Sequence, residues 1–145
     1  MENYPHLAIE LVWEDSDLEE LLISASNERY AGTAQVYFAL GDMKDLAEAI
    51  RDFPRTVSQE VIFSGGTEDS DRFARLVFKC FDGVGHTLVR ICLAEVFQEY
   101  ARPELRGRVE FDLLFEALAL DEFVRNLELV AARKLARALL RGTGT

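Results

Sequence analysis

Three side chains of this sequence could carry nucleophilic or proton-transfer chemistry: His86 and the thiols of Cys80 and Cys92. His86 follows the turn 82–85, which reads Asp-Gly-Val-Gly, and the two cysteines lie in the apolar runs on either side of this turn. A thiolate beside an imidazole is the arrangement of a cysteine nucleophile. Free cysteine is also among the most buried residue types, and no cluster of oxyanion donors accompanies these residues. We therefore expect two free thiols that serve packing, with His86 as the main polar group of a candidate pocket.

Carboxylates form the second group with chemical potential. They gather in the turns 14–17 and 65–71, and they alternate with apolar residues as Glu110 and Asp112. Such oxygen ligands suit a hard cation, but the 65–71 loop lacks the pattern of an EF-hand. Glu110 and Asp112 stand where an exposed strand face requires polar residues. The sequence therefore predicts no catalytic residue, no metal site and no cofactor.

The composition is that of one globular domain, with 145 residues, of which 49% are hydrophobic and 29% charged. The formal net charge of -10 counts against a phosphate-binding surface, so we expect no nucleic-acid partner. The first residues lack the basic and apolar regions of a secretory signal, and no apolar run is long enough to span a membrane. We expect a cytoplasmic protein that does not contact membranes.

Hydrophobic periodicity predicts the elements that must position these side chains. Strands are expected at 7–13, 30–40, 57–63, 72–81, 86–96 and 106–115, whereas the run 18–26 fits either a strand or the beginning of a helix. A short helix is expected from Asp42 to Phe53, and a long one begins at Asp121. This order predicts an α+β fold: a predominantly antiparallel sheet or sandwich of about seven strands, with one short internal helix and one long C-terminal helix.

Two of the expected strands have clearly different faces. Alternation groups Leu7, Ile9, Leu11 and Trp13 on one apolar side of the first strand. Within 30–40, the same alternation places Tyr37 on the polar side. We therefore expect Trp13 to face the core and Tyr37 to face away from it.

The end of the last helix changes character. Arg133, Arg137 and Arg141 continue the angular sector that apolar residues occupy earlier in the helix, so this part cannot face an apolar core. Leu135 and Leu139 remain together beside the arginines. We expect a single domain over 1–132, followed over 133–145 by a basic helical extension and a flexible tail. A second copy of the chain could bury the leucine face, which predicts a homodimer with the arginines against acidic side chains.

Three segments together resemble small acidic bacterial cytoplasmic proteins of unassigned function, some of which look like immunity proteins of toxin systems. The segments are the run 85–91, the strand 108–113 and the residues 120–124 that open the last helix. The resemblance covers roughly 30–129 and implies a small α+β domain. It brings no catalytic motif, so no residue acquires a role from it.

The two ends of the sequence carry opposite charge. Residues 1–30 contain eight acidic side chains and one basic side chain, whereas residues 123–145 contain five basic and one acidic. Patterned charge of this kind favours a non-enzymatic interaction module whose acidic surface binds a basic protein, such as an immunity-type inhibitor. Two alternatives remain open: a small-ligand-binding or enzymatic domain with a pocket near His86, and a structural homo-oligomer.

Overall fold

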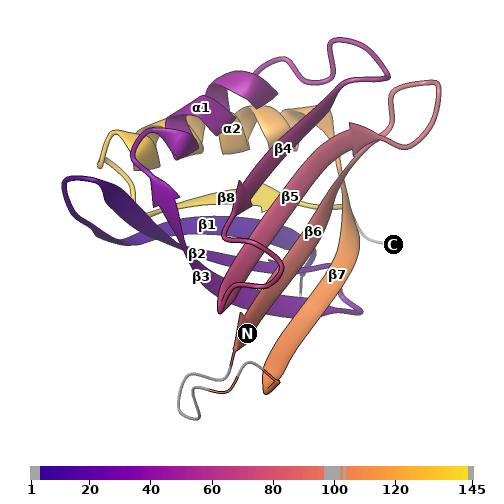
Figure 1. Ribbon diagram of the computed structural model, residues 1–145. Coiled ribbons are helices and arrows are strands. Elements are labelled where there is room, and N and C mark those ends of the chain that lie inside the picture. The colour runs from indigo at the N-terminus through magenta and orange to yellow at the C-terminus, as the bar shows by residue number, and fades with distance from the viewer. Residues whose placement is uncertain (1–3, 97–101, 103, 144–145) are drawn as a thin grey trace.

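The computed structural model describes residues 4–96, 102 and 104–143 (Figure 1). This part of the chain contains eight strands and two helices, in the order β1 (His6–Glu14), β2 (Leu18–Ser26), β3 (Ala31–Ala39), α1 (Asp42–Ile50), β4 (Glu60–Gly65), β5 (Arg72–Cys80), β6 (Thr87–Val96), β7 (Arg106–Phe115), α2 (Ala117–Ala131) and β8 (Arg137–Arg141). None of the helices described is both long enough and apolar enough to cross a membrane.

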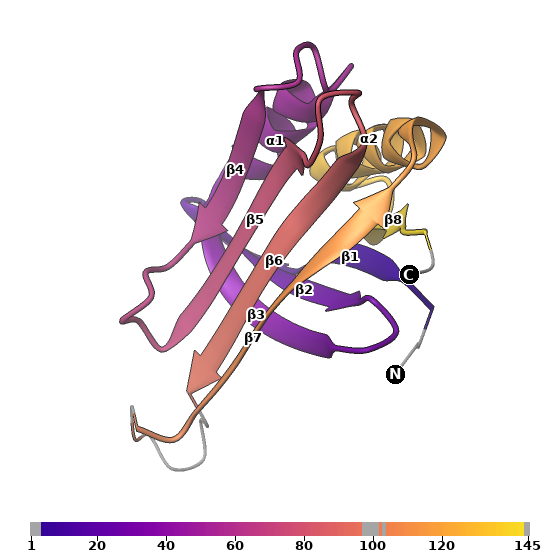
Figure 2. The same cartoon turned by 90° about the vertical axis from the view of Figure 1, so that its right-hand side faces the viewer.

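The strands form two antiparallel sheets of four strands each. Sheet A has the order β3-β2-β1-β8, and sheet B has the order β4-β5-β6-β7. The sheets meet where β3 packs against β5 and β6, while α1 and α2 pack against each other on the opposite side of the interior (Figures 1 and 2). The predicted α+β class and antiparallel pairing are confirmed. The strand count differs from the expected seven because β8 forms from residues for which we expected a helix.

One hydrophobic core fills the space between the two sheets and the two helices. Its largest fully buried side chains come from both sheets and both helices: Phe78, Phe123, Leu7, Ile9, Leu21, Ile23, Met43, Ile50, Leu76, Ile91, Leu93 and Leu113. Each such side chain contributes roughly 1.5–3 kcal/mol through burial. The core therefore depends on every layer of the domain at once.

The run 18–26, for which the sequence left strand and helix open, is strand β2. Residues 19, 21, 23 and 25 are buried, and the residues between them are more exposed, as strand alternation requires. β2 pairs with β1 on one side and β3 on the other. Pairing on both edges outweighs the local helical spacing of its leucines.

α1 covers Asp42–Ile50 and so begins at the expected residue, although Asp42 is not its N-cap, and α2 begins earlier than expected. Gly41, with φ of 92°, is the N-cap of α1, and Asp42 instead accepts a hydrogen bond at 3.0 Å from the backbone N–H of Ala39. α2 begins at Ala117, four residues before the predicted Asp121. The helices are joined by an ion pair between Arg51 and Glu128 at 2.5 Å. The amphipathic stripes of both helices were nevertheless predicted correctly, because they face the same core.

The prediction of a basic helical extension beyond residue 132 is wrong. α2 ends at Ala131, Arg133 adopts a left-handed conformation with φ of 63°, and residues 137–141 form β8 beside β1. Ala138 and Leu140 are fully buried, so the segment alternates with period two rather than following a helical stripe. Beyond β8, the N–H of Thr143 donates to the carbonyl of Leu114 in β7 and links the two sheets. The segment closes the domain instead of leaving it.

An ion-pair cluster joins the start of this C-terminal segment to the β1–β2 hairpin. Arg133 contacts Glu14 at 2.5 Å through Nε and Glu19 at 3.1 Å through Nη2. The Glu19 side chain is only 2% exposed, and its Oε1 is buried with no hydrogen-bond partner in the described chain. Burial raises the pKa of Glu19, and the positive charge of Arg133 opposes that rise. The opposite charges of the two chain ends thus meet within one molecule.

Replacing Arg133 by Met should destabilise the protein by about 2 kcal/mol at pH 7, because it leaves the Glu19 carboxylate buried without its counterion. Folding raises the pKa of Glu19, so its protonated form favours the folded state, and this stability is lost as pH rises through the folded pKa. The loss in R133M should therefore shrink in acid. Adding Glu19→Gln should restore most of the stability. Urea unfolding at pH 5 and pH 7 measures these effects, with the exposed Arg125→Met as control; equal losses for both arginines would contradict the argument.

Two adjacent leucines of β8 distinguish a strand from a helical extension. Leu140 is fully buried, whereas Leu139 points away from the core and is half-buried. We expect Leu140→Ala to cost about 3 kcal/mol and Leu139→Ala less than about 1 kcal/mol. Chemical denaturation of the two variants measures the difference. A larger loss for Leu139 would mean that residues 137–141 do not pair with β1 in this register.

Candidate functional site

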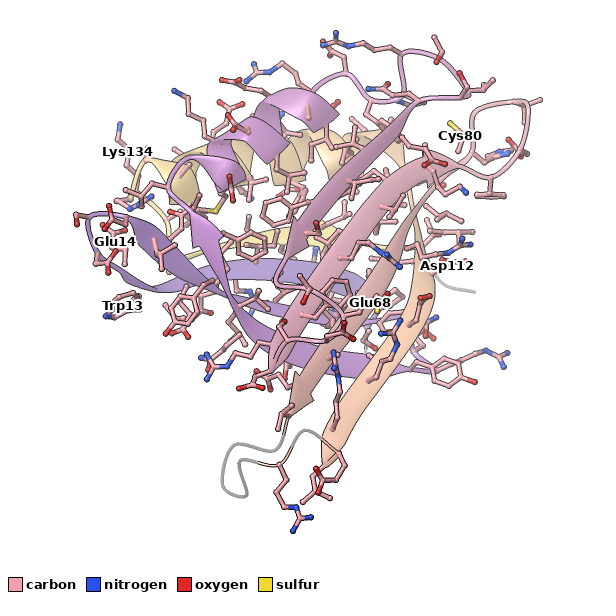
Figure 3. The ribbon with its side chains drawn as sticks, viewed as in Figure 1. Trp13, Glu14, Glu68, Cys80, Asp112 and Lys134 are labelled. Atoms are coloured by element: carbon pink, nitrogen blue, oxygen red, sulfur yellow. The ribbon has the colours of Figure 1, made fainter. Side chains whose placement is uncertain are left out.

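A β-bulge in β1 reverses the orientation expected for Trp13. Leu11 pairs with Leu21, but the register shifts at Val12, and Trp13 then pairs with Glu20. The extra residue moves Trp13 to the outer face of sheet A, where its side chain is 47% exposed. The prediction that Trp13 shares the buried face of Leu7 and Ile9 is therefore wrong. Trp13 lies beside the β1–β2 turn at the left of Figure 3.

Trp13 forms an aromatic pair with Tyr37. The register places Trp13, Glu20 and Tyr37 side by side on β1, β2 and β3. The two rings approach edge to face, with 6.1 Å between their centroids and 85° between their planes. The Glu20 carboxylate accepts a hydrogen bond at 2.7 Å from Arg72 at the start of β5. Sheet B thus anchors the middle of this row.

The surroundings of this pair combine apolar and acidic side chains. Leu18 has the same strand parity as Glu20, and it is partly exposed. The adjoining turn carries Asp15 and Asp17, and Asp15 accepts hydrogen bonds from the backbone N–H groups of residues 17 and 18. These bonds lower the pKa of Asp15, so it stays charged. We call Trp13, Leu18, Glu20 and Tyr37 the aromatic face, and Glu14, Asp15 and Asp17 its acidic rim.

A hollow of about 440 Å³ adjoins the aromatic face at Tyr37. Its other walls come from the β4–β5 loop, including Gly66, Ser70 and Arg72. The loop is tightly closed: Gly66 has φ of 73°, and a Cβ there would lie 2.2 Å from the carbonyl oxygen of Arg72. Ser70 also accepts a hydrogen bond from the N–H of Thr67. The β4–β5 loop therefore forms a wall of fixed conformation beside Tyr37.

The pocket predicted near His86 lies at the far end of sheet B. A hollow of about 180 Å³ is lined there by aromatic, apolar and a few polar residues: Phe53, Pro54, Phe81, Gly85, His86, Thr87, Leu114, Phe115, Glu116, Ala117 and Thr143. His86 Nδ1 lies 2.5 Å from Asp82 Oδ2, and its ring stacks on Phe81. The hydrogen bond that the His86 ring donates to the Asp82 carboxylate raises the pKa of His86. His86 thus has an oriented imidazole, although most of it faces solvent.

The two thiols do not join His86. Both cysteines are free and buried, as the sequence predicts, and they lie on opposite faces of sheet B. Cys92 sits on the outer face beneath charged side chains that include Arg75 and Glu110, and burial raises its pKa. Within the described residues, no hydrogen bond connects either thiol to the imidazole. A thiol–imidazole pair therefore does not form.

Three of the carboxylates singled out in the sequence, Glu68, Glu110 and Asp112, pair with arginines on the outer face of sheet B. Asp112 accepts two hydrogen bonds from Arg90, at 2.8 and 3.1 Å, in the two-pronged geometry of a strong pair. Glu68 of the β4–β5 loop lies 3.5 Å from Arg108 and 3.8 Å from Arg75, across the outer face of sheet B. No three acidic, histidine or cysteine side chains of the described residues are grouped to hold a metal ion. These ion pairs fix the positions of charged side chains on the outer face of sheet B.

The five residues of the predicted dimer interface do not form one helical surface: Arg137, Leu139 and Arg141 share the outer face of β8, whereas Arg133 and Leu135 precede the strand. Arg133 is committed to Glu14 and Glu19, and Arg141 lies over the ring of Tyr4. Leu135 lies in the connection before β8, whereas Leu139 and Arg137 belong to the strand itself. The amphipathic helical surface on which the dimer prediction rested is therefore absent from this structure.

Comparisons with protein-family models, curated sequences and solved structures give no significant match for this chain. The functional argument therefore rests on the geometry of the sites themselves. Sequence reasoning identified His86 and the outward side of Tyr37, but it missed the aromatic face. One signal in the sequence was available: Trp13 directly precedes the acidic turn 14–17, and a residue beside an exposed turn can face solvent.

The oriented histidine gives a direct titration test. The pKa of His86 should lie above its ordinary value of 6.5, because Asp82 stabilises the imidazolium. Asp82→Asn should lower it toward that value. Since folding raises this pKa, the pair contributes stability that is present below the unfolded pKa and is lost as pH rises through the folded pKa. NMR titration of the His86 ring protons measures the shift; no change in D82N would show that Asp82 does not hold the ring.

Proposed function

We propose that this protein is a non-enzymatic interaction module that binds a basic protein through its aromatic face and acidic rim. The observation that carries the proposal is the edge-to-face pair of Trp13 and Tyr37, held half-exposed on regular strands. Tryptophan and tyrosine dominate the binding energy of protein interfaces, especially in positions surrounded by a polar rim. Their location on paired strands rather than on a loop fixes the rings before binding, which reduces the entropic cost of association.

The charge of the rim indicates the chemistry of the partner. Asp15 and Asp17 give this end of the molecule negative charge, whereas Glu14 is paired with Arg133, and the net charge of the whole chain is -10. Such a field accelerates encounter with a basic surface and disfavours acidic competitors. An arginine of the partner can also stack on the face of Trp13. A cytoplasmic inhibitor that covers a basic, toxin-like protein fits this chemistry.

A second copy of the chain fits the same face less well. A two-fold interface brings the same patch of both molecules together, so the acidic rims would face each other. Like charges placed across an interface oppose association. We therefore favour a different, basic protein over a homodimer as the occupant.

A small-ligand site at His86 is the second candidate function. It is favoured by the hollow of about 180 Å³ and by the imidazole that Asp82 orients. Ligand pockets usually enclose about 300–1,000 Å³, so this hollow accepts only a small molecule. The exposed aromatic pair is the stronger indication, since its two large rings remain about half exposed to solvent.

Purification of the tagged protein from its native cells tests the proposal. The wild type should capture a basic protein, and the double variant Trp13→Ala, Tyr37→Ala should weaken that binding at least about thirtyfold, because one interface hot spot contributes about 2 kcal/mol. Leu118→Ala, which removes a side chain that is 82% exposed on α2, is the matched control. Association should slow as salt is raised. Capture of only neutral or acidic proteins, or full binding by the double variant, would refute the proposal.

A further inference from the structure

A second surface feature lies beside the acidic rim, where α1 runs along the edge of sheet B. β4 is an edge strand, paired only with β5 among the described residues. A hollow of about 300 Å³ separates β4 from α1. The strand side consists of the consecutive residues 61–64, and the helix side consists of Asp42, Asp45, Leu46 and Ala49. We call this hollow the α1–β4 slot.

The lining of the slot shows that it exposes a strand edge. Neighbouring residues of a strand point to opposite faces, so four consecutive residues can line one hollow only along the backbone edge. An edge strand presents N–H and C=O groups that can pair with another chain. Phe63 closes the interior behind the slot by stacking on Phe38, with 4.5 Å between the ring centroids. Ile62, on the opposite face of the strand, is 61% exposed.

The helix side of the slot is negatively charged. Residues 42, 45, 46 and 49 follow the i, i+3, i+4 and i+7 spacing of a single helical stripe, so both carboxylates face the strand edge. Asp42 also contributes to the electrostatic environment of Glu19, which places the acidic end of the slot near the hairpin that carries the rim. Leu18, on the aromatic face, pairs with Ala39 three residues before α1 begins. The acidic end of the slot therefore lies near the β1–β2 hairpin that carries the proposed binding surface.

We propose that the free edge of β4 accepts an extended segment rich in lysine and arginine from the partner protein, as a fifth strand of sheet B. This inference rests on the proposed function and specifies how part of the partner is bound. Backbone hydrogen bonds to β4 supply affinity, and alternate basic side chains point toward Asp42 and Asp45. A second copy of the same edge would bring two sets of these carboxylates together, so charge selects a basic strand over self-pairing.

The test uses a defined probe, an acetylated and amidated peptide of alternating lysine and valine. In the ¹⁵N-labelled full-length protein, the peptide should shift the amide signals of residues 61–64 and of the first turns of α1, and it should slow hydrogen exchange along β4. A peptide of the same sequence with an N-methyl group on every amide has no N–H donors and cannot form a strand ladder along either edge. Equal binding of both peptides, or signal changes only on the aromatic face, would overturn strand addition.

Variants separate the slot from the aromatic face. Ile62→Lys places a positive charge on the exposed edge, which discourages strand pairing and repels the peptide, so it should abolish the changes along β4. Leu118→Lys adds the same charge on α2 and should leave binding intact. Asp45→Asn should weaken binding roughly two- to fivefold, as expected for an exposed ion pair. The Trp13→Ala, Tyr37→Ala variant should still bind the peptide, so the slot and the aromatic face can fail independently.

Discussion

The C-terminal part of this fold depends on one buried carboxylate, that of Glu19. Glu19 lies on the inner face of β2, where an apolar residue would be expected, and Arg133 supplies its counterion from a segment 114 residues away. An ionised carboxylate in such a place is costly unless it is paired, so the turn after α2 must return to the β1–β2 hairpin. Arg133 adopts its left-handed conformation in this turn. Once the turn is fixed, residues 137–141 lie beside β1 and complete sheet A.

The same ion pairs determine what the hairpin presents to solvent. Arg133 neutralises much of the charge of Glu14 and Glu19, whereas Asp15 and Asp17 remain at the turn. The bulge at Val12 then turns Trp13 outward onto a sheet that is fixed on both sides. The result is a rigid aromatic surface next to unneutralised acid, which is a combination suited to protein recognition. Near the same hairpin, β4 leaves one strand edge unpaired among the described residues, beside the α1–β4 slot.

Sequence periodicity was sufficient for the fold class and for most strands, because buried positions alternate in strands such as β3, β5 and the second half of β7. It failed where a long-range contact outweighs a local pattern. Arg133, Arg137 and Arg141 follow helical spacing, but pairing with β1 makes their segment a strand. The orientation of Trp13 depends on one extra residue in β1, and period-two reasoning cannot locate a bulge. Of the site, Tyr37 and His86 could be predicted, whereas the partner of Trp13 required the register of three strands.

Because β1 pairs with β8, the domain cannot finish folding until the residues of β8 have been synthesised. Residues 6–10 are synthesised some 130 residues before their partners at 137–141. Until then, β1 has a free edge, and the apolar stripe of α2 lacks the strand against which it packs. Pairing between strands that are far apart in the sequence slows folding and prolongs the exposure of unpaired strand edges, which promote aggregation. A nascent chain of this protein would therefore depend on its acidic side chains, or on a chaperone, to remain unaggregated until β8 emerges.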